Sequence, residues 1–234
     1  MASYPRYAVY YAPEPGSVLD CFGSELLGYD AHRGVDMPFS PGTALPPDWH
    51  AITQDPRKYG FHATLKAPMA LAPDYHETEL AAACEAFAAA PRPIPLVNPV
   101  VDTIEGFIAI VPAARCPDLQ NLAAGCVREF DRFRAPLTDD DRARRNPWSL
   151  TRRQRDYLDA WGYPYVFEEF RFHMTLTGRL NAERQPLLLH PLRDRFRASG
   201  LNDLTIDRIV LFRQDGADRR FRIIGGWPLR RAKP

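Results

Sequence analysis

One short run occurs twice in the chain, as His-Ala-Thr-Leu at residues 62–65 and as His-Met-Thr-Leu at residues 173–176. Each copy lies in a strand-like stretch rich in apolar and aromatic residues, at residues 59–66 and 170–177. Self-similarity of this kind indicates a repeated structural unit. The two runs therefore predict a chain that is built from two related halves.

The surroundings of the two runs match as well. A strand-like stretch followed by a helix precedes each run, beginning near Tyr7 in the first half and near Phe107 in the second. After each run we expect another helix and another strand. The repeated β-α-β-α-β unit predicts an α+β fold with two pseudo-symmetric lobes around a central cleft lined by antiparallel sheets. We expect a single domain over residues 1–234, with lobe 1 at about 1–104 and lobe 2 at about 105–234.

Local patterns place the individual elements. Ser17 is a suitable N-cap for a helix that runs to about Leu27, because its hydroxyl can accept a hydrogen bond from the first helical turn. Prolines within residues 94–101 predict an edge strand there, because proline has no N–H to donate to a neighbouring strand. We expect further strands at 6–12, 59–69, 106–111, 204–213 and 220–227, and further helices at about 74–90, 118–133 and 184–198.

Two long segments lack a regular pattern. Residues 28–57 contain several prolines and are expected to form an irregular loop, which in a compact domain is often a lid over a ligand. Residues 134–160 are polar and rich in arginine, and they predict a helical connector inserted into the second half. Runs of charge usually face water, so we interpret the connector as a solvated surface. The alternative is that its arginines lean over the active site.

Strand alternation identifies the polar residues that accompany the two histidines. Successive side chains of a strand point to opposite faces, so every second residue shares a face. This rule predicts two polar sets in an open groove, His62, Thr64 and Lys66 on one strand and His173, Thr175 and Thr177 on the other. Tyr10 and Tyr59 are weaker candidates, since aromatic residues can stack on a base or ribose but serve equally well in a core.

Paired histidines of near-neutral pKa can hold opposite protonation states and serve as a base and an acid. Phosphodiester cleavage requires both, and a Thr two residues away can contact an oxygen of the same phosphate. A single strand histidine is more often a structural residue with a satisfied partner. Two copies at equivalent places in a duplicated unit favour one shared catalytic site instead. His62, Thr64, His173 and Thr175 are therefore the candidate catalytic residues, although the sequence leaves open which histidine is the acid.

Composition argues against several other classes of protein. The formal net charge is +1 and the chain has no long basic tract, so we expect no stable complex with nucleic acid. No apolar run is long enough to span a membrane, and the four cysteines lie far apart without metal-ligand spacing. We expect a cytoplasmic protein with reduced cysteines, no metal, no cofactor and no obligate protein partner. The expected partner is a small phosphorylated substrate.

At its two His-x-Thr runs the chain resembles the 2H phosphoesterase superfamily, which includes cyclic phosphodiesterases and 2′-5′ RNA ligase-like proteins. The resemblance covers nearly the whole chain and implies a bilobal fold with His62 and His173 as the catalytic pair. It also implies that Thr64 and Thr175 bind phosphate oxygens, without a metal. The stretches at residues 6–13, 58–68 and 170–178 look like a subfamily found with phosphonate-degradation operons, which implies phosphoribosyl 1,2-cyclic phosphate as a substrate.

Three functions compete on these grounds. The leading hypothesis is a metal-independent phosphodiesterase that opens a small cyclic phosphate derived from a nucleotide or a ribose. The second is an RNA end-processing phosphoesterase of the 2′-5′ ligase-like type, which the near-neutral charge disfavours because a polynucleotide channel needs a basic lining. The third is a non-catalytic module that binds a phosphorylated ligand, which would not need a matched acid and base.

Overall fold

A seven-stranded sheet runs through the centre of the molecule, as seen in a computed structural model that describes residues 3–39 and 45–233. The strand order is β11-β10-β1-β4-β8-β7-β6, and neighbouring strands pair in antiparallel fashion. The fold is therefore α+β, as expected. The strands are β1 (Arg6–Tyr11), β4 (Ala63–Ala70), β6 (Pro99–Ile104), β7 (Phe107–Pro112), β8 (Met174–Thr175), β10 (Arg208–Gln214) and β11 (Arg222–Pro228).

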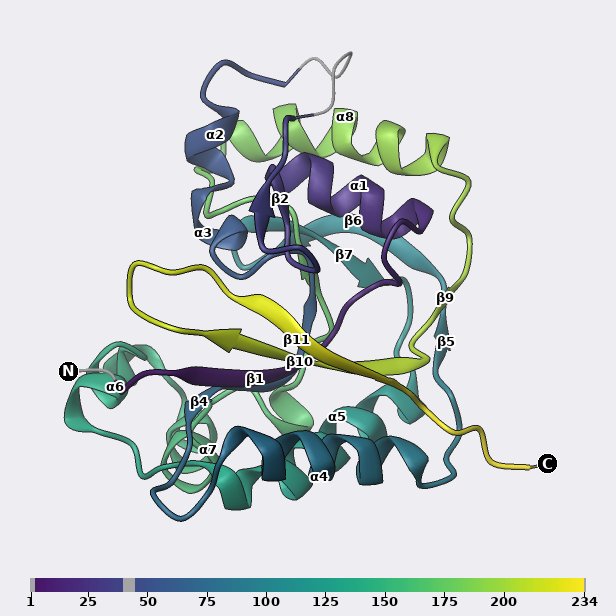
Figure 1. Ribbon diagram of the computed structural model, residues 1–234. Coiled ribbons are helices and arrows are strands. Elements are labelled where there is room, and N and C mark those ends of the chain that lie inside the picture. Colours follow the sequence, from purple (N-terminus) through teal and green to yellow (C-terminus); the bar gives the residue numbers. More distant parts are fainter. Residues whose placement is uncertain (1–2, 40–44, 234) are drawn as a thin grey trace.

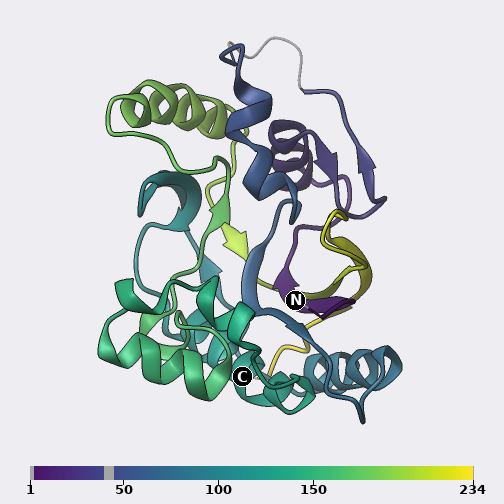
Figure 2. The same ribbon diagram turned by 90° about the vertical axis from the view of Figure 1, so that its left-hand side faces the viewer.

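Helices cover the sheet on two sides (Figures 1 and 2). In the view of Figure 1, α1 and α8 lie above the sheet, and α4 and α5 lie below it. Helix α5 packs on β4, α4 packs on β10 and β11, and α8 packs on β6 and β7. The helices are α1 (Val18–Leu27), α4 (Glu77–Ala89), α5 (Pro117–Phe130) and α8 (Arg184–Ala198). The apolar faces of all four contribute to one continuous core.

The helix expected after Ser17 is confirmed, together with the reason for its start. The Ser17 hydroxyl accepts a hydrogen bond from the backbone N–H of Asp20, and α1 ends at Gly28 in the left-handed conformation that glycine tolerates best. Phe22 on α1 meets Phe196 on α8 edge to face, with ring centroids 5.3 Å apart. This contact joins the two helices that cover the upper side of the sheet.

Residues 28–57 are more regular than we expected from their prolines. They contain two short strands that pair with each other, β2 (Tyr29–Asp30) and β3 (Val35–Asp36), and two short helices, α2 (Trp49–Ile52) and α3 (Gln54–Arg57). The indole N–H of Trp49 donates to the carbonyl of Leu26, 2.8 Å away. The backbone N–H of Gly178, just after the second His-x-Thr run, donates to the carbonyl of Ile52. The described parts of this segment are therefore tied to the body of the protein; residues 40–44 lie outside the described residues.

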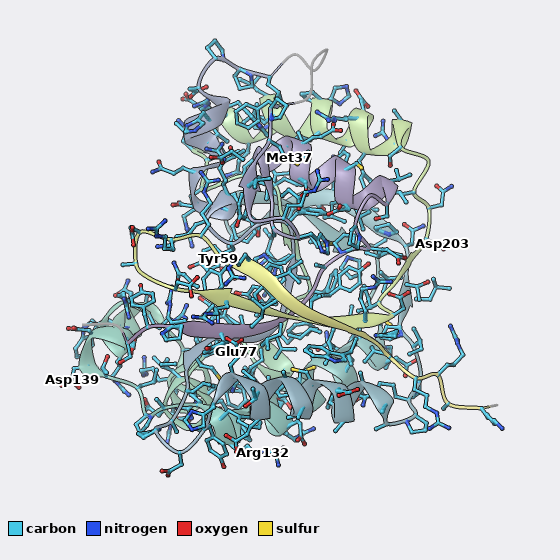
Figure 3. All side chains as sticks on the ribbon, viewed as in Figure 1. Met37, Tyr59, Glu77, Arg132, Asp139 and Asp203 are labelled. Atoms are coloured by element: carbon cyan, nitrogen blue, oxygen red, sulfur yellow. The ribbon has the colours of Figure 1, made fainter. Side chains whose placement is uncertain are left out.

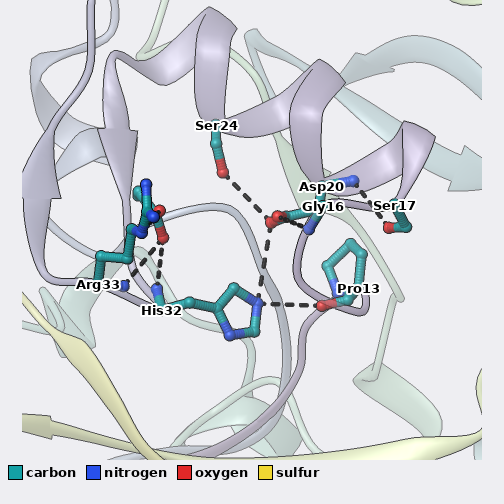
Figure 4. A network of polar contacts seen from close by, with 8 residues as sticks. Pro13, Gly16, Ser17, Asp20, Ser24, His32 and Arg33 are labelled. Carbon is teal, nitrogen blue, oxygen red and sulfur yellow. Dashed lines mark hydrogen bonds and ion pairs between the residues drawn. The ribbon is translucent and has the colours of Figure 1, made fainter.

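A polar network fastens the turn between β2 and β3 to α1 (Figure 4). The His32 ring nitrogen Nε2 lies 3.1 Å from the carbonyl oxygen of Pro13 and 3.8 Å from a carboxylate oxygen of Asp20. Asp30 accepts hydrogen bonds from the backbone N–H groups of His32 and Arg33. His32 is half-buried, because it links the turn after β2 to the segment before α1.

The connector at 134–160 is helical in part. It contains α6 (Asp139–Ala143), the 3-10 turn η2 (Pro147–Ser149) and most of α7 (Arg152–Trp161). Leu158 is fully buried and fastens α7, whereas Trp148 is 93% exposed. Helix α6, with Asp139 at its start, lies at one edge of the molecule beside the beginning of β1 (Figures 1 and 3). Most of the connector faces water, but its arginines also reach a groove described below.

In the sheet, strands from one half of the sequence pair with strands from the other half. Strand β6 precedes residue 105 but pairs with β7, and β10 lies in the second half but pairs with β1. The edge position expected for the proline-rich strand is confirmed, because β6 is the last strand on its side. A further small pair joins β5 (Leu96–Val97) to β9 (Leu204–Thr205). A cut near residue 104 would therefore separate paired strands.

Candidate active site

The two His-x-Thr runs lie on neighbouring strands at the centre of the sheet. Ala63 of β4 is the direct antiparallel partner of Met174 of β8, and both side chains are fully buried in the core. Continuing this register by one residue in each direction sets His62 across from Thr175, and Thr64 across from His173. Because alternate residues share a face, all four side chains project away from the core together. The structure thus brings the four candidate catalytic residues into one cluster.

Both histidines are oriented by the same backbone device. The Nδ1 atom of His62 lies 2.9 Å from the carbonyl oxygen of Gly60, and Nδ1 of His173 lies 2.7 Å from the carbonyl oxygen of Arg171. A carbonyl oxygen only accepts hydrogen bonds, so each Nδ1 carries the proton. Each neutral ring therefore has a free lone pair on Nε2. The hydroxyl of Thr64 lies 3.4 Å from Nε2 of His62.

Gly60 is the residue that allows this arrangement before the first run. Its φ of +75° is in the left-handed region, and a Cβ added there would lie 2.6 Å from Cβ of Ala31. Any side chain would therefore be strained and would collide with the turn after β2. The left-handed backbone conformation of Gly60 sets the direction of its carbonyl group, and this carbonyl group orients His62.

The two rings differ in their electrostatic surroundings. The pKa of His62 is lowered to about 4, chiefly by burial and in smaller part by His173, while the Gly60 carbonyl acts in the opposite direction. Burial also lowers the pKa of His173, but the Arg171 carbonyl and then the Glu105 carboxylate act in the opposite direction. His62 therefore takes up a proton only at a lower pH than an ordinary histidine does.

Glu105 is a site residue that the sequence analysis did not identify. It lies with Gly106 in the two-residue turn between β6 and β7, and both residues have positive φ, 49° and 93°. A two-residue hairpin loop that ends in glycine is the available sequence signal for such a turn. The signal predicts the turn, but only the folded structure shows that Glu105 and His173 line the same cavity, where the carboxylate acts on the ring.

Aromatic rings flank the first histidine closely. The Tyr10 ring stacks on the His62 ring, with centroids 3.9 Å apart and planes inclined by 22°. Tyr59 is tilted against His62 at 6.0 Å and stacks on Phe221 at 5.2 Å. Tyr10 is almost fully buried, so it packs on the His62 ring from the protein interior and is not free to stack on a ligand. Tyr59 is half-buried and stays accessible at the rim of the site.

A cavity of about 210 Å³ opens beside Thr64 and His173. Its lining is largely apolar and aromatic, and it includes Phe107 and Tyr163, with Glu105 among its few charged groups. His62 and Thr175 do not line this cavity. The cavity therefore extends from one side of the cluster, where it can hold the organic part of a ligand whose phosphate lies between the histidines.

Lys66 does not join the cluster, although alternation predicted that it would. Tyr10 pairs with Thr64 but Val9 pairs with Lys66, so Leu65 is an extra residue that forms a β-bulge. A bulge shifts the alternation by one residue and turns Lys66 to the other side of the sheet. There it is buried, and its Nζ lies 2.5 Å from the Asp131 carboxylate. Lys66 is a structural residue that connects β4 to the end of α5.

Thr177 is displaced for the same reason. The backbone N–H groups of Leu176 and Thr177 both point to the carbonyl oxygen of Ile108, at 2.9 and 3.3 Å, which indicates a second bulge. The Thr177 hydroxyl is fully buried and accepts a hydrogen bond from the Ile108 N–H. The prediction that Thr177 lines the groove is therefore wrong. In both runs the leucine after His-x-Thr begins the irregularity.

Within residues 3–39 and 45–233, no group of three or more His, Cys, Asp or Glu side chains is arranged to hold a metal ion. The same described part of the chain contains no helix long and apolar enough to cross a membrane. The four cysteines are free thiols.

A comparison with protein families gives a match over residues 64–222 to the family described as "Protein of unknown function (DUF1045)". The matched region includes Thr64 and the whole second run and begins just after His62. This chain belongs to the DUF1045 family. The description assigns no reaction to the family, so the geometry of the site has to suggest one.

Two curated relatives of this DUF1045 chain carry the same name, "Ribose 1,5-bisphosphate phosphokinase PhnN". The protein from Janthinobacterium sp. (strain Marseille) is 39% identical over 183 residues, which are 76% of this chain and 40% of the relative. The protein from Laribacter hongkongensis (strain HLHK9) is 32% identical over 222 residues, 93% of this chain and 50% of the relative. The chain thus spans half or less of the curated relatives that it matches.

One solved structure, the protein TT0787 of Thermus thermophilus, aligns with 97% of the DUF1045 chain and all of its own. The sequence identity is 15% and the TM-score is 0.47. This likeness is too weak to carry an argument, and the proposals below rest on the site.

Proposed function

We propose that this chain is a metal-independent phosphodiesterase of the 2H phosphoesterase type, which opens a small cyclic phosphate by acid and base catalysis with two histidines. The observation that carries the proposal is the matched orientation of His62 and His173 by the Gly60 and Arg171 carbonyls. Both rings offer Nε2 on the face that they share with two threonine hydroxyls. This is the set of groups that in-line attack on a phosphodiester requires.

The reaction needs one proton removed and one supplied. The base takes a proton from water through Nε2 while the water oxygen forms its bond to phosphorus. The bond from phosphorus to one ring oxygen breaks, and the acid gives its Nε2 proton to that oxygen. Thr64 and Thr175 donate hydrogen bonds to the non-bridging oxygens, where charge develops. The products are a ring-opened phosphomonoester and a histidine pair that returns to its first state by exchanging protons with water.

The surroundings of the rings favour His62 as the base and His173 as the acid. His62 has a pKa of about 4 and is neutral over most of the pH range. The Glu105 carboxylate favours the protonated form of His173 and has no counterpart among the causes that act on His62. A difference of this kind between two titratable groups separates their roles.

Two observations support the proposal of pseudo-symmetric lobes. Each motif strand has its His-x-Thr run followed by a bulge at leucine, and each histidine bonds the carbonyl two residues before it. Strand β4 is flanked by β1, and β8 is flanked by β7, which are the strands we expected to be equivalent. The pairing of β6 with β7 and of β10 with β1 crosses the proposed boundary between the lobes, which supports the proposal of a single domain.

A phosphorylated ribose is the substrate class that we favour. The cavity beside His173 has room for a sugar or a base, and the relatives' printed name specifies a ribose bisphosphate. Phosphoribosyl 1,2-cyclic phosphate has a ribose that the cavity can hold, and it is a phosphorylated ribose like the compound in the relatives' name. A place in phosphonate metabolism also agrees with the resemblance to proteins of phosphonate-degradation operons. Nucleoside 2′,3′-cyclic phosphates remain the other candidates within the same reaction class.

A kinase reaction is the alternative that the relatives' name raises. The three lysines of the sequence follow Arg57, Leu65 and Ala232, so no Gly-Lys-Ser/Thr run of a phosphate-binding loop is present in these 234 residues. The name describes proteins at least twice as long as their match to this chain. We therefore assign to this chain the phosphodiesterase role, since the relatives' name belongs to those longer proteins as wholes.

The test is a product-resolved assay of His62→Ala and His173→Ala with excess chelator. The substrates are 2′,3′-cyclic nucleotides, ribosyl 1,2-cyclic phosphates and an ADP-ribose cyclic phosphate. Each substitution should lower kcat by about 10²–10⁴ on the best substrate, because each removes one proton-transfer group. His190→Ala is the matched control, since its side chain on α8 is 79% exposed and does not line the cavity beside His173.

Full activity in either histidine variant would rule out the two-histidine mechanism. Loss of wild-type activity in chelator, restored by a divalent cation, would rule out the metal-independent reaction. Binding of phosphate esters without turnover of any substrate would favour the non-catalytic module. Tight, salt-dependent binding of RNA that competes with the cyclic phosphates would favour the RNA end-processing alternative.

A further inference from the structure

A second, larger hollow adjoins the cluster through Tyr59, whose ring lies beside that of His62. It has a volume of about 370 Å³ and is bounded by the beginning of β1, by the residues before the first run and by the α6 end of the connector. We call it the cationic groove, because its charged lining consists of Arg6, Lys58, Arg134, Arg144, Arg145 and one acid, Asp141. The proposed reaction does not use any of these residues.

Two of the arginines in the groove have carboxylate partners. Arg134 forms two hydrogen bonds with the Asp131 carboxylate, and Arg144 forms an ion pair with Asp141. Arg144 therefore contributes little to the attraction of a ligand, whereas Arg134 shares Asp131 with Lys66 and keeps part of its charge.

The other three cations have no carboxylate partner among the described residues. Arg6 is half-buried and bonds a neutral group, the side-chain oxygen of Gln214, 3.0 Å from its Nε. Gln214 is itself fully buried, so it holds the guanidinium in place without cancelling its charge. Arg145 lies over the Tyr163 ring, 4.9 Å from its centroid, and Lys58 is half-buried at the groove wall. The groove therefore presents a net positive charge, and neighbouring side chains hold two of its cations, Arg6 and Arg145, in place.

The groove adjoins the catalytic cluster at two points. Tyr59 lines the groove, and its ring centroid is 6.0 Å from that of His62 (Figure 3 shows Tyr59 beside the central strands). Arg145 lines the groove and contacts Tyr163, which lines the cavity shared by Thr64 and His173. A ligand whose reacting phosphate lies between the histidines can thus place a second group in the groove.

We infer that the cationic groove binds a second, terminal phosphate of the substrate, so that the preferred substrates are sugar or nucleoside cyclic phosphates that also carry a phosphomonoester. Arginine binds phosphate through two parallel hydrogen bonds, and a lysine adds a flexible point charge. A phosphomonoester carries nearly two negative charges at neutral pH, which matches a site with three unneutralised cations. The inference rests on the proposed function for the reacting end of the substrate and adds the recognition of its other end.

The decisive comparison uses one cyclic phosphate with and without its terminal phosphate, 5-phosphoribosyl 1,2-cyclic phosphate and ribosyl 1,2-cyclic phosphate. The wild type should prefer the first in kcat/KM. In Lys58→Ala and Arg145→Ala this preference should fall about tenfold each, mostly through KM, because each loses a charge-assisted hydrogen bond. Arg197→Ala removes an arginine that is 69% exposed on α8 and should keep the wild-type preference.

A binding measurement separates this inference from the proposed reaction. Ribose 5-phosphate should bind the wild type more tightly than ribose in calorimetry, and Lys58→Ala and Arg145→Ala should weaken it about tenfold. Thr64→Val should have a smaller effect, because the terminal phosphate does not lie at the threonines. This result would uphold the groove even if no cyclic phosphate were hydrolysed, in which case the proposed function alone would fail.

Three results would overturn the inference. The first is equal kcat/KM of the wild type for the two cyclic phosphates. The second is binding of ribose 5-phosphate that is lost in Thr64→Val but unchanged in Lys58→Ala and Arg145→Ala, because the phosphate would then occupy the catalytic cluster. The third is micromolar binding of single-stranded RNA that depends on the groove residues and displaces ribose 5-phosphate, because the groove would then track a polynucleotide backbone.

Discussion

The His62 side and the His173 side of the candidate site orient their rings in the same way but surround them differently. Each Nδ1 is bonded by the carbonyl of the residue two positions before. The His62 ring is stacked on Tyr10 at 3.9 Å and lies next to a groove of unneutralised cations. The His173 ring meets Phe107 at 5.5 Å and lies in a mainly apolar cavity near the Glu105 carboxylate.

This difference shows how a duplicated motif can acquire two roles. The backbone fixes the tautomer and direction of both rings, and this part is shared. Whether a ring carries a proton depends on the charges beside it, which come from segments outside the motif. A neighbouring carboxylate on one side only is sufficient to make one histidine the better acid. The comparison therefore predicts that the two histidines are both essential but not interchangeable.

The largest expected effect tests that asymmetry directly. A cyclic phosphate with sulfur in place of the leaving ring oxygen should restore His173→Ala to within about tenfold of the wild type, because a thiolate leaves without a proton. The same substrate should leave His62→Ala with its loss of about 10²–10⁴, because water still requires a base. The measurement is kcat of each variant on the oxygen and the sulfur substrate, with His190→Ala as the control.

Rescue of His62→Ala in place of His173→Ala would reverse the roles. Equal rescue of both variants would show that the surroundings of the two histidines do not give them different roles. The difference between the two sides of the site would then have no part in catalysis.

Much of this site followed from local rules. Alternation between neighbouring residues placed His62 with Thr64 and His173 with Thr175, because the strands are regular over those positions. Helix capping placed α1 correctly, since Ser17 and Gly28 act within one turn of the helix. The repeat of the run predicted one shared cluster, and the pairing of Ala63 with Met174 brings the four side chains together.

Features that depend on distant strands could not be obtained in this way. Lys66 and Thr177 are one step beyond each leucine, where a bulge reverses the face, and bulges arise from the pairing with β1 and β7. Glu105 and the cationic groove join segments that are far apart in sequence and have no common pattern. Residues 28–57 look irregular because prolines interrupt them, yet tertiary contacts such as that of Trp49 with Leu26 order their described parts.

An intermediate effect is expected at the carbonyl that orients His62. Gly60→Ala should lower the free energy of unfolding by about 3 kcal/mol, because a positive φ costs about 1 kcal/mol and crowding against Ala31 adds about 2. Turnover per folded molecule should also fall, since the carbonyl that holds Nδ1 must shift. Chemical denaturation and an assay corrected for the folded fraction measure the two losses.

Gly200→Ala is the matched control for this substitution. Its φ of +72° is nearly the same, but no atom lies within 4 Å of an added Cβ. It should lose only about 1 kcal/mol and keep its turnover. If the two variants were equally stable and equally active, crowding at Gly60 would not orient His62.

The smallest expected effect is on pH dependence and concerns Glu105. In the free enzyme kcat/KM should rise with pH through the His62 pKa of about 4 and fall again where His173 loses its proton, on the acid side of 6.5. The Glu105 carboxylate stabilises the imidazolium of His173, so Glu105→Gln should lower the pKa of His173 and move only the alkaline limb to lower pH. The loss at neutral pH should be a few-fold, because the carboxylate is 44% exposed, water screens it, and the Arg171 guanidinium lies 3.8 Å away. Glu85→Gln on α4 is the control. A shift of the acidic limb in Glu105→Gln would show that the carboxylate acts on the pKa of His62, and the two histidines would then no longer differ in this respect.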